Sequence, residues 1–297
     1  MTRLLRWLSL TCSILALCAA TAWGQVLSTG VTTPYRVVAN VTYLTANNFD
    51  AKLDVYSRTD ATTPQPTLIW IHGGGWIQGN KETATFNVLP YLEMGWNVVN
   101  VEYRLGKVSL APAAVEDCLC ALRWVIRNAN EYHFDVTKLV VSGGSAGGHL
   151  ALTTAMIPAS AGLDRQCPGT DALKVAAVVD WFGITDVADL LDGPNMKTYA
   201  VQWLGSTPDR VEIAKRVSPL TYVRPGLPPV LTIHGDADVT VPYQHAVRLH
   251  EALSKVNVPN QLLTIPGGKH GNFTPDERTK IFVTIRDFLA KNGLGGA

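Results

Sequence analysis

Six short apolar runs alternate along the chain with longer stretches of helical periodicity. The runs are rich in valine, isoleucine and leucine and cover residues 67–71, 97–101, 138–141, 175–181, 230–234 and 261–265. Such unbroken runs are typical of strands that are buried on both faces of a parallel sheet. The intervening stretches predict helices over residues 83–94, 112–132, 145–156, 244–255 and 279–292. This alternation predicts a doubly wound α/β fold with its site at the carboxyl ends of the strands.

Two further segments add an entry hairpin and an insertion to this predicted fold. Residues 35–45 and 51–57 alternate apolar and polar side chains, which predicts an antiparallel entry hairpin and brings the sheet to eight strands. Residues 186–219 break the rhythm with several short helical pieces separated by glycine and proline. We expect this insertion after the sixth strand to cover the crevice as a small cap.

The first two dozen residues read as a secretory leader. Arg3 and Arg6 precede an apolar run over residues 8–22, and the small residues Ala22 and Gly24 bracket a possible cleavage site. A membrane anchor would need about 20 apolar residues, and this run is shorter. We therefore expect residues 1–24 to be removed as a signal peptide. The mature protein should then be secreted or periplasmic, without stable insertion in the membrane. Leu17 fits a lipoprotein signal at Cys18 poorly, and lipidation of that cysteine stays open.

Size and charge narrow the class of protein further. Residues 25–297 have the length of one α/β domain, with no composition shift that marks a second. The net charge is +1 and only 16% of residues are charged. Because there is no basic face to hold a phosphate backbone, we expect no nucleic-acid partner.

Three cysteines lie beyond the leader. Cys118 and Cys120 are two apart on a predicted helix, so their side chains diverge and they should not pair with each other. Cys118 lies near the apolar face of that helix, whereas Cys120 points away from it. This favours a disulfide between Cys120 and Cys167, with three unpaired thiols as the alternative. No CxxC pair or HxxxH helix predicts a metal site.

The segment VSGGSAGGHL places Ser145 between glycines, where the strand 138–141 would turn into the helix 145–156. A G-x-S-x-G turn of this kind is sharp and strained, and small neighbours leave the hydroxyl exposed above the sheet. An ordinary glycine-rich turn is the alternative reading. The flanking strand and helix favour a nucleophile.

A serine nucleophile needs a base and an acid, which should follow later strands. His270 lies among glycines directly after the last strand and is the leading base. The turn after the seventh strand offers Asp238 and Asp236. A carboxylate next to a strand end more often caps the turn, while one two residues further on projects toward the histidine loop. We therefore choose Asp238, with Asp236 as the alternative, which gives the chain order Ser, Asp, His of this hydrolase architecture.

The segment HGGGW after the strand 67–71 predicts the oxyanion donors. A glycine run lets bare N–H groups approach a reacting carbonyl, and neither a P-loop nor a GxGxxG spacing supports a phosphate site. We assign the N–H groups of Gly73 and Gly74, together with that of Ala146, to the tetrahedral oxygen.

These motifs resemble the α/β-hydrolase superfamily, and HGGGW with GGSAGGHLA resembles the hormone-sensitive-lipase-like esterases. More narrowly, the chain is similar to the bifunctional acetylxylan/feruloyl esterase group through HGGGWIQGNK, VNVEYRL, PAAVEDC, ALRWV, GGSAGGHLAL, VVDWFGITD, VSPLTYV, PPVLTIHGDADVTVPY and GGKHGNF. The resemblance implies the same nucleophile, acid, base and oxyanion donors and prefers Asp238 over Asp236. It also favours Cys120 as the cysteine that pairs, since such helices often carry a lone cysteine where Cys118 lies.

The resemblance implies hydrolysis of acyl esters without a metal or cofactor, on acetyl or feruloyl esters of plant polysaccharide or on small short-chain esters. Trp76 and Trp181 are adjacent to the motifs and are candidates for a substrate pocket. A serine peptidase of prolyl-oligopeptidase-like type and a non-catalytic binder of polysaccharide or phenolics are the alternatives. Peptidases of that type usually carry a propeller and a GGSYGG elbow, and neither is found in this sequence. A non-catalytic binder would not need an intact triad.

Overall fold

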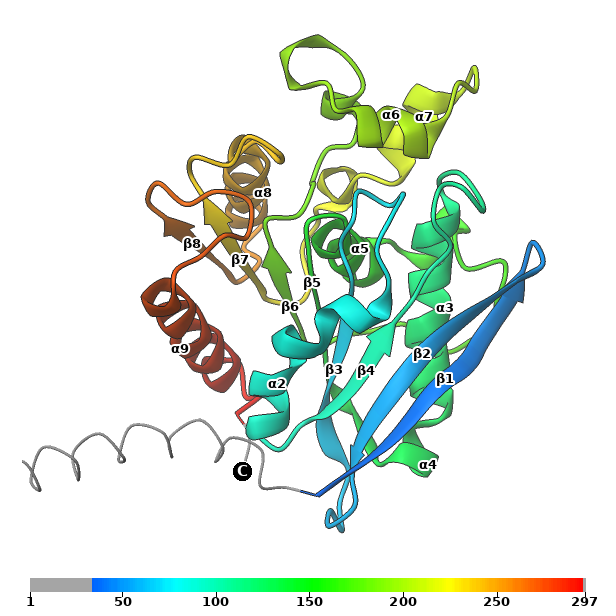
Figure 1. Cartoon of the computed structure of the whole chain (residues 1–297), viewed down its shortest axis with the longest axis vertical. Helices are drawn as coiled ribbons and strands as arrows, with labels where there is room; N and C mark the ends of the chain where they lie inside the picture. Colours follow the sequence, from blue (N-terminus) through cyan, green and yellow to red (C-terminus); the bar gives the residue numbers. More distant parts are fainter. Residues whose placement is uncertain (1–33, 296–297) are drawn as a thin grey trace, which may run out of the picture.

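Residues 34–295 are described by a computed structural model (Figure 1), and they form an α/β structure around one sheet. The strands are β1 (Tyr35–Ala46), β2 (Phe49–Arg58), β3 (Gln65–Ile71), β4 (Asn97–Val101), β5 (Phe134–Gly144), β6 (Ala177–Trp181), β7 (Val230–Gly235) and β8 (Asn260–Ile265). Their order is β1-β2-β4-β3-β5-β6-β7-β8. The pairs β1–β2 and β2–β4 are antiparallel, and every pair from β4 to β8 is parallel. The eight-stranded, mostly parallel sheet is confirmed.

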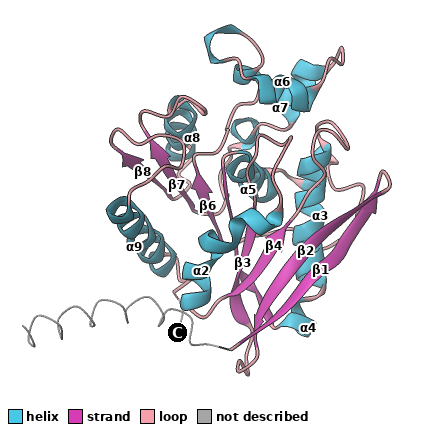
Figure 2. Cartoon of the chain, in the orientation of Figure 1, coloured by secondary structure: helices cyan, strands magenta, loops and turns pink. Residues whose placement is uncertain are grey.

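Helices cover both faces of the sheet (Figure 2). They are α2 (Thr85–Glu93), α3 (Ala113–Arg127), α4 (Ala129–Tyr132), α5 (Ala146–Met156), α6 (Thr198–Leu204), α7 (Arg210–Arg216), α8 (Gln244–Lys255) and α9 (Pro275–Lys291). Buried side chains of α2 and α9 share one core with the sheet, and those of α3, α5 and α8 share the other. The sheet is therefore the central layer of three.

The strand β3 shows why the central strands are largely apolar. Leu68 and Trp70 pack into the core beneath α2 and α9, whereas Ile69 and Ile71 pack into the core beneath α3 and α5. Because successive side chains of a strand point to opposite faces, a strand covered on both sides needs apolar side chains on both.

Helix ends differ from the predicted ones where local capping decides them. The last helix begins at Pro275 rather than at residue 279, because Thr274 forms a capping box with Glu277 and Pro275 occupies the first turn. The predicted helix over residues 112–132 ends at Arg127, and the short α4 follows it and ends at His133 in a left-handed conformation.

The segment between β6 and β7, where the sequence predicts a cap, consists of short helical pieces. It contains 3-10 turns at Ala188–Leu190, Gly193–Asn195 and Pro219–Tyr222, with α6 and α7 between them. Figure 1 shows α6 and α7 beyond the end of α5 that begins at the sheet's carboxyl edge. This segment therefore lies over the edge of the sheet where the candidate site is expected.

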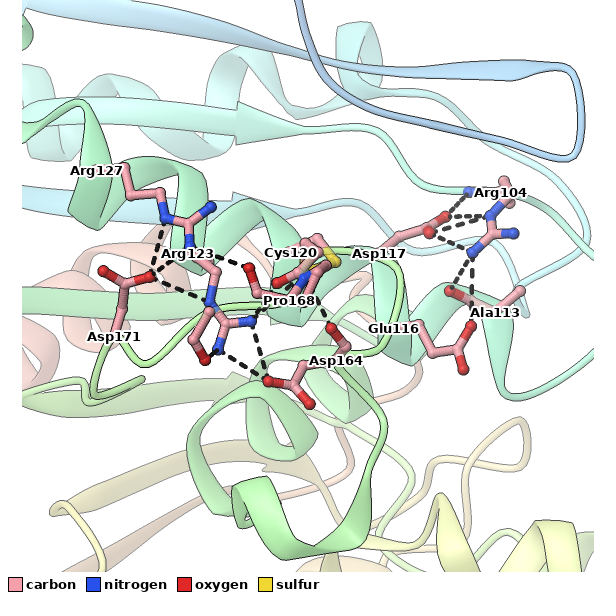
Figure 3. Close-up of a disulfide and its surroundings, with 12 residues drawn as sticks. Arg104, Ala113, Glu116, Asp117, Cys120, Arg123, Arg127, Asp164, Pro168 and Asp171 are labelled. Atoms are coloured by element: carbon pink, nitrogen blue, oxygen red, sulfur yellow. Dashed lines mark hydrogen bonds and ion pairs between the residues drawn. A yellow bond between two sulfur atoms is a disulfide. The ribbon is translucent and has the colours of Figure 1, made fainter.

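Cys120 of α3 is joined to Cys167 by a disulfide, with Cα atoms 5.6 Å apart, and Cys118 is a free, buried thiol. Figure 3 shows the polar contacts around this bridge. Arg123, one turn further along α3, donates to the backbone oxygen of Cys167 at 2.5 Å and to Asp164 at 2.8 Å. The disulfide and the arginine together fasten the loop that follows α5 to α3.

Replacing Cys120 and Cys167 together with alanine is expected to lower the free energy of unfolding by about 2–4 kcal/mol, because the bridge closes a long loop in the unfolded chain. The two cysteines are 47 residues apart. Urea unfolding followed by circular dichroism measures the change. Cys118→Ala is the control without loss of a cross-link. An unchanged urea midpoint of the double variant would contradict a stabilising role.

Candidate active site

Ser145 lies at a strained turn between β5 and α5. Its backbone angles are φ 59° and ψ −120°, a region that residues other than glycine rarely occupy. Its N–H donates to the Trp181 carbonyl at 2.8 Å, which fixes the turn against the end of β6. A Cβ atom on Gly147 would collide with the carbonyl oxygen of Ile71. The small residue at this position therefore lets the start of α5 approach the end of β3, and the serine is held at the carboxyl edge of the sheet.

The glycine loop after β3 lies directly beside Ser145. A Cβ atom on Gly73 would be 2.6 Å from the carbonyl oxygen of Gly144 and 3.5 Å from Cβ of Ser145. Gly74 has φ +116°, and a Cβ atom there would overlap the backbone of Gln78. Only glycines fit these two positions, so bare backbone lies next to the serine. The candidate oxyanion loop thus lies against the turn that holds Ser145.

Asp238 and His270 form a short hydrogen bond between the loops that follow β7 and β8. The His270 Nδ1 and Asp238 Oδ2 atoms are 2.6 Å apart. The other carboxylate oxygen, Oδ1, accepts from the N–H groups of Thr240 at 2.8 Å and Val241 at 3.0 Å. Asp238 is 6% exposed. The carboxylate is therefore fully partnered and orients the imidazole by its Nδ1 side.

The pKa of Asp238 is held well below its usual range. Burial acts to raise this pKa, but hydrogen bonds from His234 and His270 lower it by more. The carboxylate is consequently ionised at neutral pH and can stabilise a positive imidazolium. Within residues 34–295 the Ser145 hydroxyl has no hydrogen-bond partner, so the structure joins the acid to the base but not the base to the serine.

The alternative acid, Asp236, has a different contact. Its Oδ1 atom accepts from the N–H of Gly267 at 2.7 Å, which links the two loops that carry Asp238 and His270. No contact between Asp236 and His270 is made in the described part of the chain. Asp236 therefore ties the two loops together, whereas Asp238 accepts from the backbone N–H groups of its own turn as well as from His270.

Two residues of the site were not assigned from the sequence. His234, at the end of β7, is buried, and its Nε2 atom is 3.3 Å from Asp238 Oδ2 and 3.1 Å from the carbonyl oxygen of Val241. Phe182 follows β6, and its ring centre is 4.6 Å from that of His270. His234 occurs in the HGDAD motif and could have been found there. The contact of Phe182 depends on the meeting of two loops, which no local pattern indicates.

Trp76 is not accessible to a substrate, contrary to the expectation from its place beside the glycine loop. Its exposed fraction is 0%. Its ring stacks on Trp203 of α6 with centres 4.2 Å apart, and its Nε1 donates to Nδ1 of His149 at 3.1 Å. His149 in turn donates from Nε2 to the carbonyl oxygen of Val217 at 2.7 Å. Trp76 therefore anchors the segment between β6 and β7, while Trp181 is 5% exposed and lines a small pocket.

The buried histidines predict a loss of stability in acid. Burial lowers the pKa of His149 to about 3 and the pKa values of His72 and His245 to about 4. The unfolded chain binds protons near pH 6.5 but the folded chain does not, so stability is complete above pH 6.5 and falls below it. Each histidine contributes about 1.4 kcal/mol per pH unit. Asp180, whose pKa burial raises to about 6, offsets the effect of one of them between pH 6 and its usual pKa.

Urea unfolding at pH 7.5 and at pH 5.0 checks this expectation. The midpoint should be clearly lower at pH 5.0, and an equal midpoint at the two values would contradict it.

Tyr199 of α6 connects the segment between β6 and β7 to the loop that carries Asp238 and to the glycine loop after β3. Its hydroxyl donates to the Thr240 carbonyl at 3.0 Å, and the Thr240 N–H donates to Asp238. A Cβ atom on Gly75 would lie 2.9 Å from Cβ of Tyr199, so the tyrosine also packs against the glycine loop. Tyr199 thus reaches the acid through one intervening residue.

Replacing Tyr199 with phenylalanine is expected to lower kcat on a chromogenic ester by about three- to tenfold, the effect of one hydrogen bond of about 1 kcal/mol. The ring and its packing are kept, so KM should change less. Tyr222→Phe is the matched control, because that hydroxyl donates to the Arg216 carbonyl at 2.7 Å instead. Equal kcat values for the wild type and Tyr199→Phe would show that the contact does not position the acid.

Residues 34–295 show neither a metal-ligand cluster nor a membrane-spanning helix. No group of three or more histidine, cysteine or acidic side chains there is arranged to hold a metal ion. No helix in that range combines the length and hydropathy that a membrane span requires. The residues predicted as a leader, including Cys18, lie outside the described part of the chain.

Comparisons with known proteins place the chain among esterases. A family model described as BD-FAE matches residues 53–253. The chain is 31% identical over 214 residues to the "Probable carboxylic ester hydrolase LipM" of Mycobacterium tuberculosis, covering 69% of this chain and 49% of that protein. It is 30% identical over 229 residues to "Esterase LipC" of the same organism, covering 74% and 56%. The chain therefore spans about half the length of these curated relatives.

Two solved structures share the fold over nearly their whole length. One is a truncated carbohydrate esterase from gut microbiota, with TM-score 0.75 and 28% identity, covering 88% of this chain and 97% of that one. The other is esterase 2 of Thermogutta terrifontis with propionate bound, with TM-score 0.72 and 27% identity, covering 89% and 96%.

Proposed function

The chain belongs to the BD-FAE family of α/β-hydrolases, and from that premise we propose that it is a carboxylic ester hydrolase with Ser145, His270 and Asp238 as its catalytic triad. The observation that carries the proposal is the 2.6 Å hydrogen bond between His270 and Asp238. The loops that hold this pair follow β7 and β8, at the same edge of the sheet as the strained serine.

In the proposed reaction the Ser145 hydroxyl attacks the ester carbonyl while His270 Nε2 takes its proton. Asp238 accepts the hydrogen bond of Nδ1 and stabilises the imidazolium. The N–H groups of Gly73, Gly74 and Ala146 donate hydrogen bonds to the carbonyl oxygen as it becomes negatively charged. His270 then gives its proton to the leaving alcohol, and a water molecule, activated by the same imidazole, releases the acid from the acyl-enzyme.

For the substrate we propose acetyl or feruloyl esters of plant polysaccharide, or small short-chain esters. The family match and the likeness to a carbohydrate esterase support the first class. The likeness to an esterase whose structures hold propionate and butyrate supports a short acyl group. We also propose export of the protein, because residues 1–24 have the pattern of a leader and the disulfide suits an oxidising compartment.

A side-by-side assay tests the proposal with acetylated xylan, methyl ferulate, p-nitrophenyl acetate and a peptide p-nitroanilide. We expect release of acid from at least one ester and none from the peptide. Cleavage of the peptide alone would favour the peptidase alternative. Equally slow hydrolysis by the wild type and by Ser145→Ala would leave only the binding alternative.

A further inference from the structure

A pocket of about 210 Å³ adjoins both the serine turn and the histidine loop. Gly144, which precedes Ser145, and Gly271, which follows His270, both line it. The remaining lining residues are Trp70, Asn87, Trp181, Phe182, Phe273 and Arg278. It lies on the side of the sheet covered by α2 and α9, since Asn87 belongs to α2 and Arg278 to α9. The pocket is therefore bounded by residues adjacent in sequence to both Ser145 and His270.

Among the residues that line this pocket, Arg278 is the only charged side chain. Arg278 is exposed and uses only Nε, which donates to the Phe273 carbonyl at 3.2 Å, so both terminal nitrogens of its guanidinium are unpaired in that part of the chain. Asn87 adds a side-chain amide, and no acidic side chain is among the lining residues. Such a set favours a ligand with a negative charge.

The wall of the pocket is held in a strained conformation. Phe182 has φ 43°, which is rare for a bulky residue. Its ring lies 3.4 Å from the position of a Cβ atom on Gly144 and 3.0 Å from that on Gly271. Its N–H donates to the Ile233 carbonyl at 2.8 Å, which helps to hold the strained turn. Strain that the surrounding structure maintains beside reacting groups is a mark of functional shape.

We propose that this pocket binds a carboxylate carried by the ester substrate, with Arg278 as its charged hydrogen-bond donor. The inference rests on the proposed esterase function. Arginine matches the geometry of a carboxylate, and aromatic walls suit the short apolar stem that links it to the ester. The volume equals about seven water-sized groups at about 30 Å³ each. This is enough for a short chain that ends in a carboxylate.

The carboxylate can belong to the acid or to the alcohol of the ester, and two substrate pairs separate these sources. For the acid side, mono-p-nitrophenyl adipate is compared with p-nitrophenyl hexanoate. For the alcohol side, 4-acetoxybenzoate is compared with its methyl ester. In each pair the readout is the ratio of kcat/KM for the anionic ester to that for the neutral ester.

Arg278→Gln is expected to lower this ratio about tenfold in one of the two pairs, the effect of one charge-assisted hydrogen bond. Lys280→Gln is the matched control, because Lys280 is exposed on the same helix and is not among the lining residues of this pocket. In the wild type, 0.5 M NaCl should also lower the ratio, since salt screens an exposed guanidinium.

A ratio of Arg278→Gln within twofold of the wild type in both pairs would overturn the inference and leave the esterase proposal intact. So would an equal loss in Lys280→Gln, because it would reveal a general effect of charge. Absence of hydrolysis of both neutral esters by the wild type would overturn the proposed function and the inference together.

Discussion

Replacing Ser145 with alanine is expected to lower kcat/KM for p-nitrophenyl acetate by a factor of about 10⁴ to 10⁶, because removal of a serine nucleophile leaves only the oxyanion donors and substrate binding. The strained turn should survive, since its N–H still donates to the Trp181 carbonyl. Stopped-assay spectrophotometry at high enzyme concentration measures the residual rate. A fluorophosphonate probe followed by peptide mass spectrometry locates the reactive hydroxyl, and it should label Ser145 in the wild type only.

Ser142→Ala is the matched control for this experiment. Ser142 lies in β5, the strand that precedes Ser145. It is buried, and its hydroxyl donates to the Val179 carbonyl at 2.7 Å. Its loss should cost about 1 kcal/mol of stability and leave kcat within about twofold of the wild type. Labelling of any residue other than Ser145, or a Ser145→Ala variant with more than a tenth of wild-type activity, would show that another group attacks the ester.

The sheet could be predicted because burial on both faces leaves a local mark. Each buried strand is largely apolar on both faces, as the opposite packing of Trp70 and Ile71 shows, so each appeared in the sequence as a mostly apolar run. The ends of the strands could be predicted less well from the sequence. The strand β5 begins at Phe134, four residues before the predicted run, because pairing with β3 continues past the apolar segment.

The candidate site could be predicted where a residue's role depends on its place after a strand. Ser145, Asp238 and His270 each follow a strand, and parallel strands bring such positions to one edge. Roles that depend on contact between distant segments could not be predicted. Trp76 is adjacent to the glycine loop in sequence, yet Trp203 and His149 bury it completely. Tyr199 reaches Thr240 only because the inserted segment folds back over the sheet.

Asp238→Asn is expected to lower kcat/KM by a factor of about 10⁴ while leaving the fold intact, since an amide of the same shape no longer fixes the imidazole tautomer or stabilises its positive form. Asp238 has a lowered pKa, so its charge is present throughout the neutral range and the loss should not be recovered at higher pH. The pH dependence of kcat/KM from pH 5 to pH 9 measures this, with circular dichroism to check the fold.

Asp236→Asn decides between the two carboxylates of the same turn. Asp236 accepts from the Gly267 N–H and has no contact with His270 in the described residues, so its amide variant keeps an oxygen acceptor for that bond. We expect its kcat/KM to stay within about tenfold of the wild type and its Tm to fall by a few degrees at most. If Asp236→Asn lost as much activity as Asp238→Asn, the two carboxylates would act as a unit. If it lost more, Asp236 would be the acid, and the 2.6 Å contact between Asp238 and His270 would not be the catalytic one.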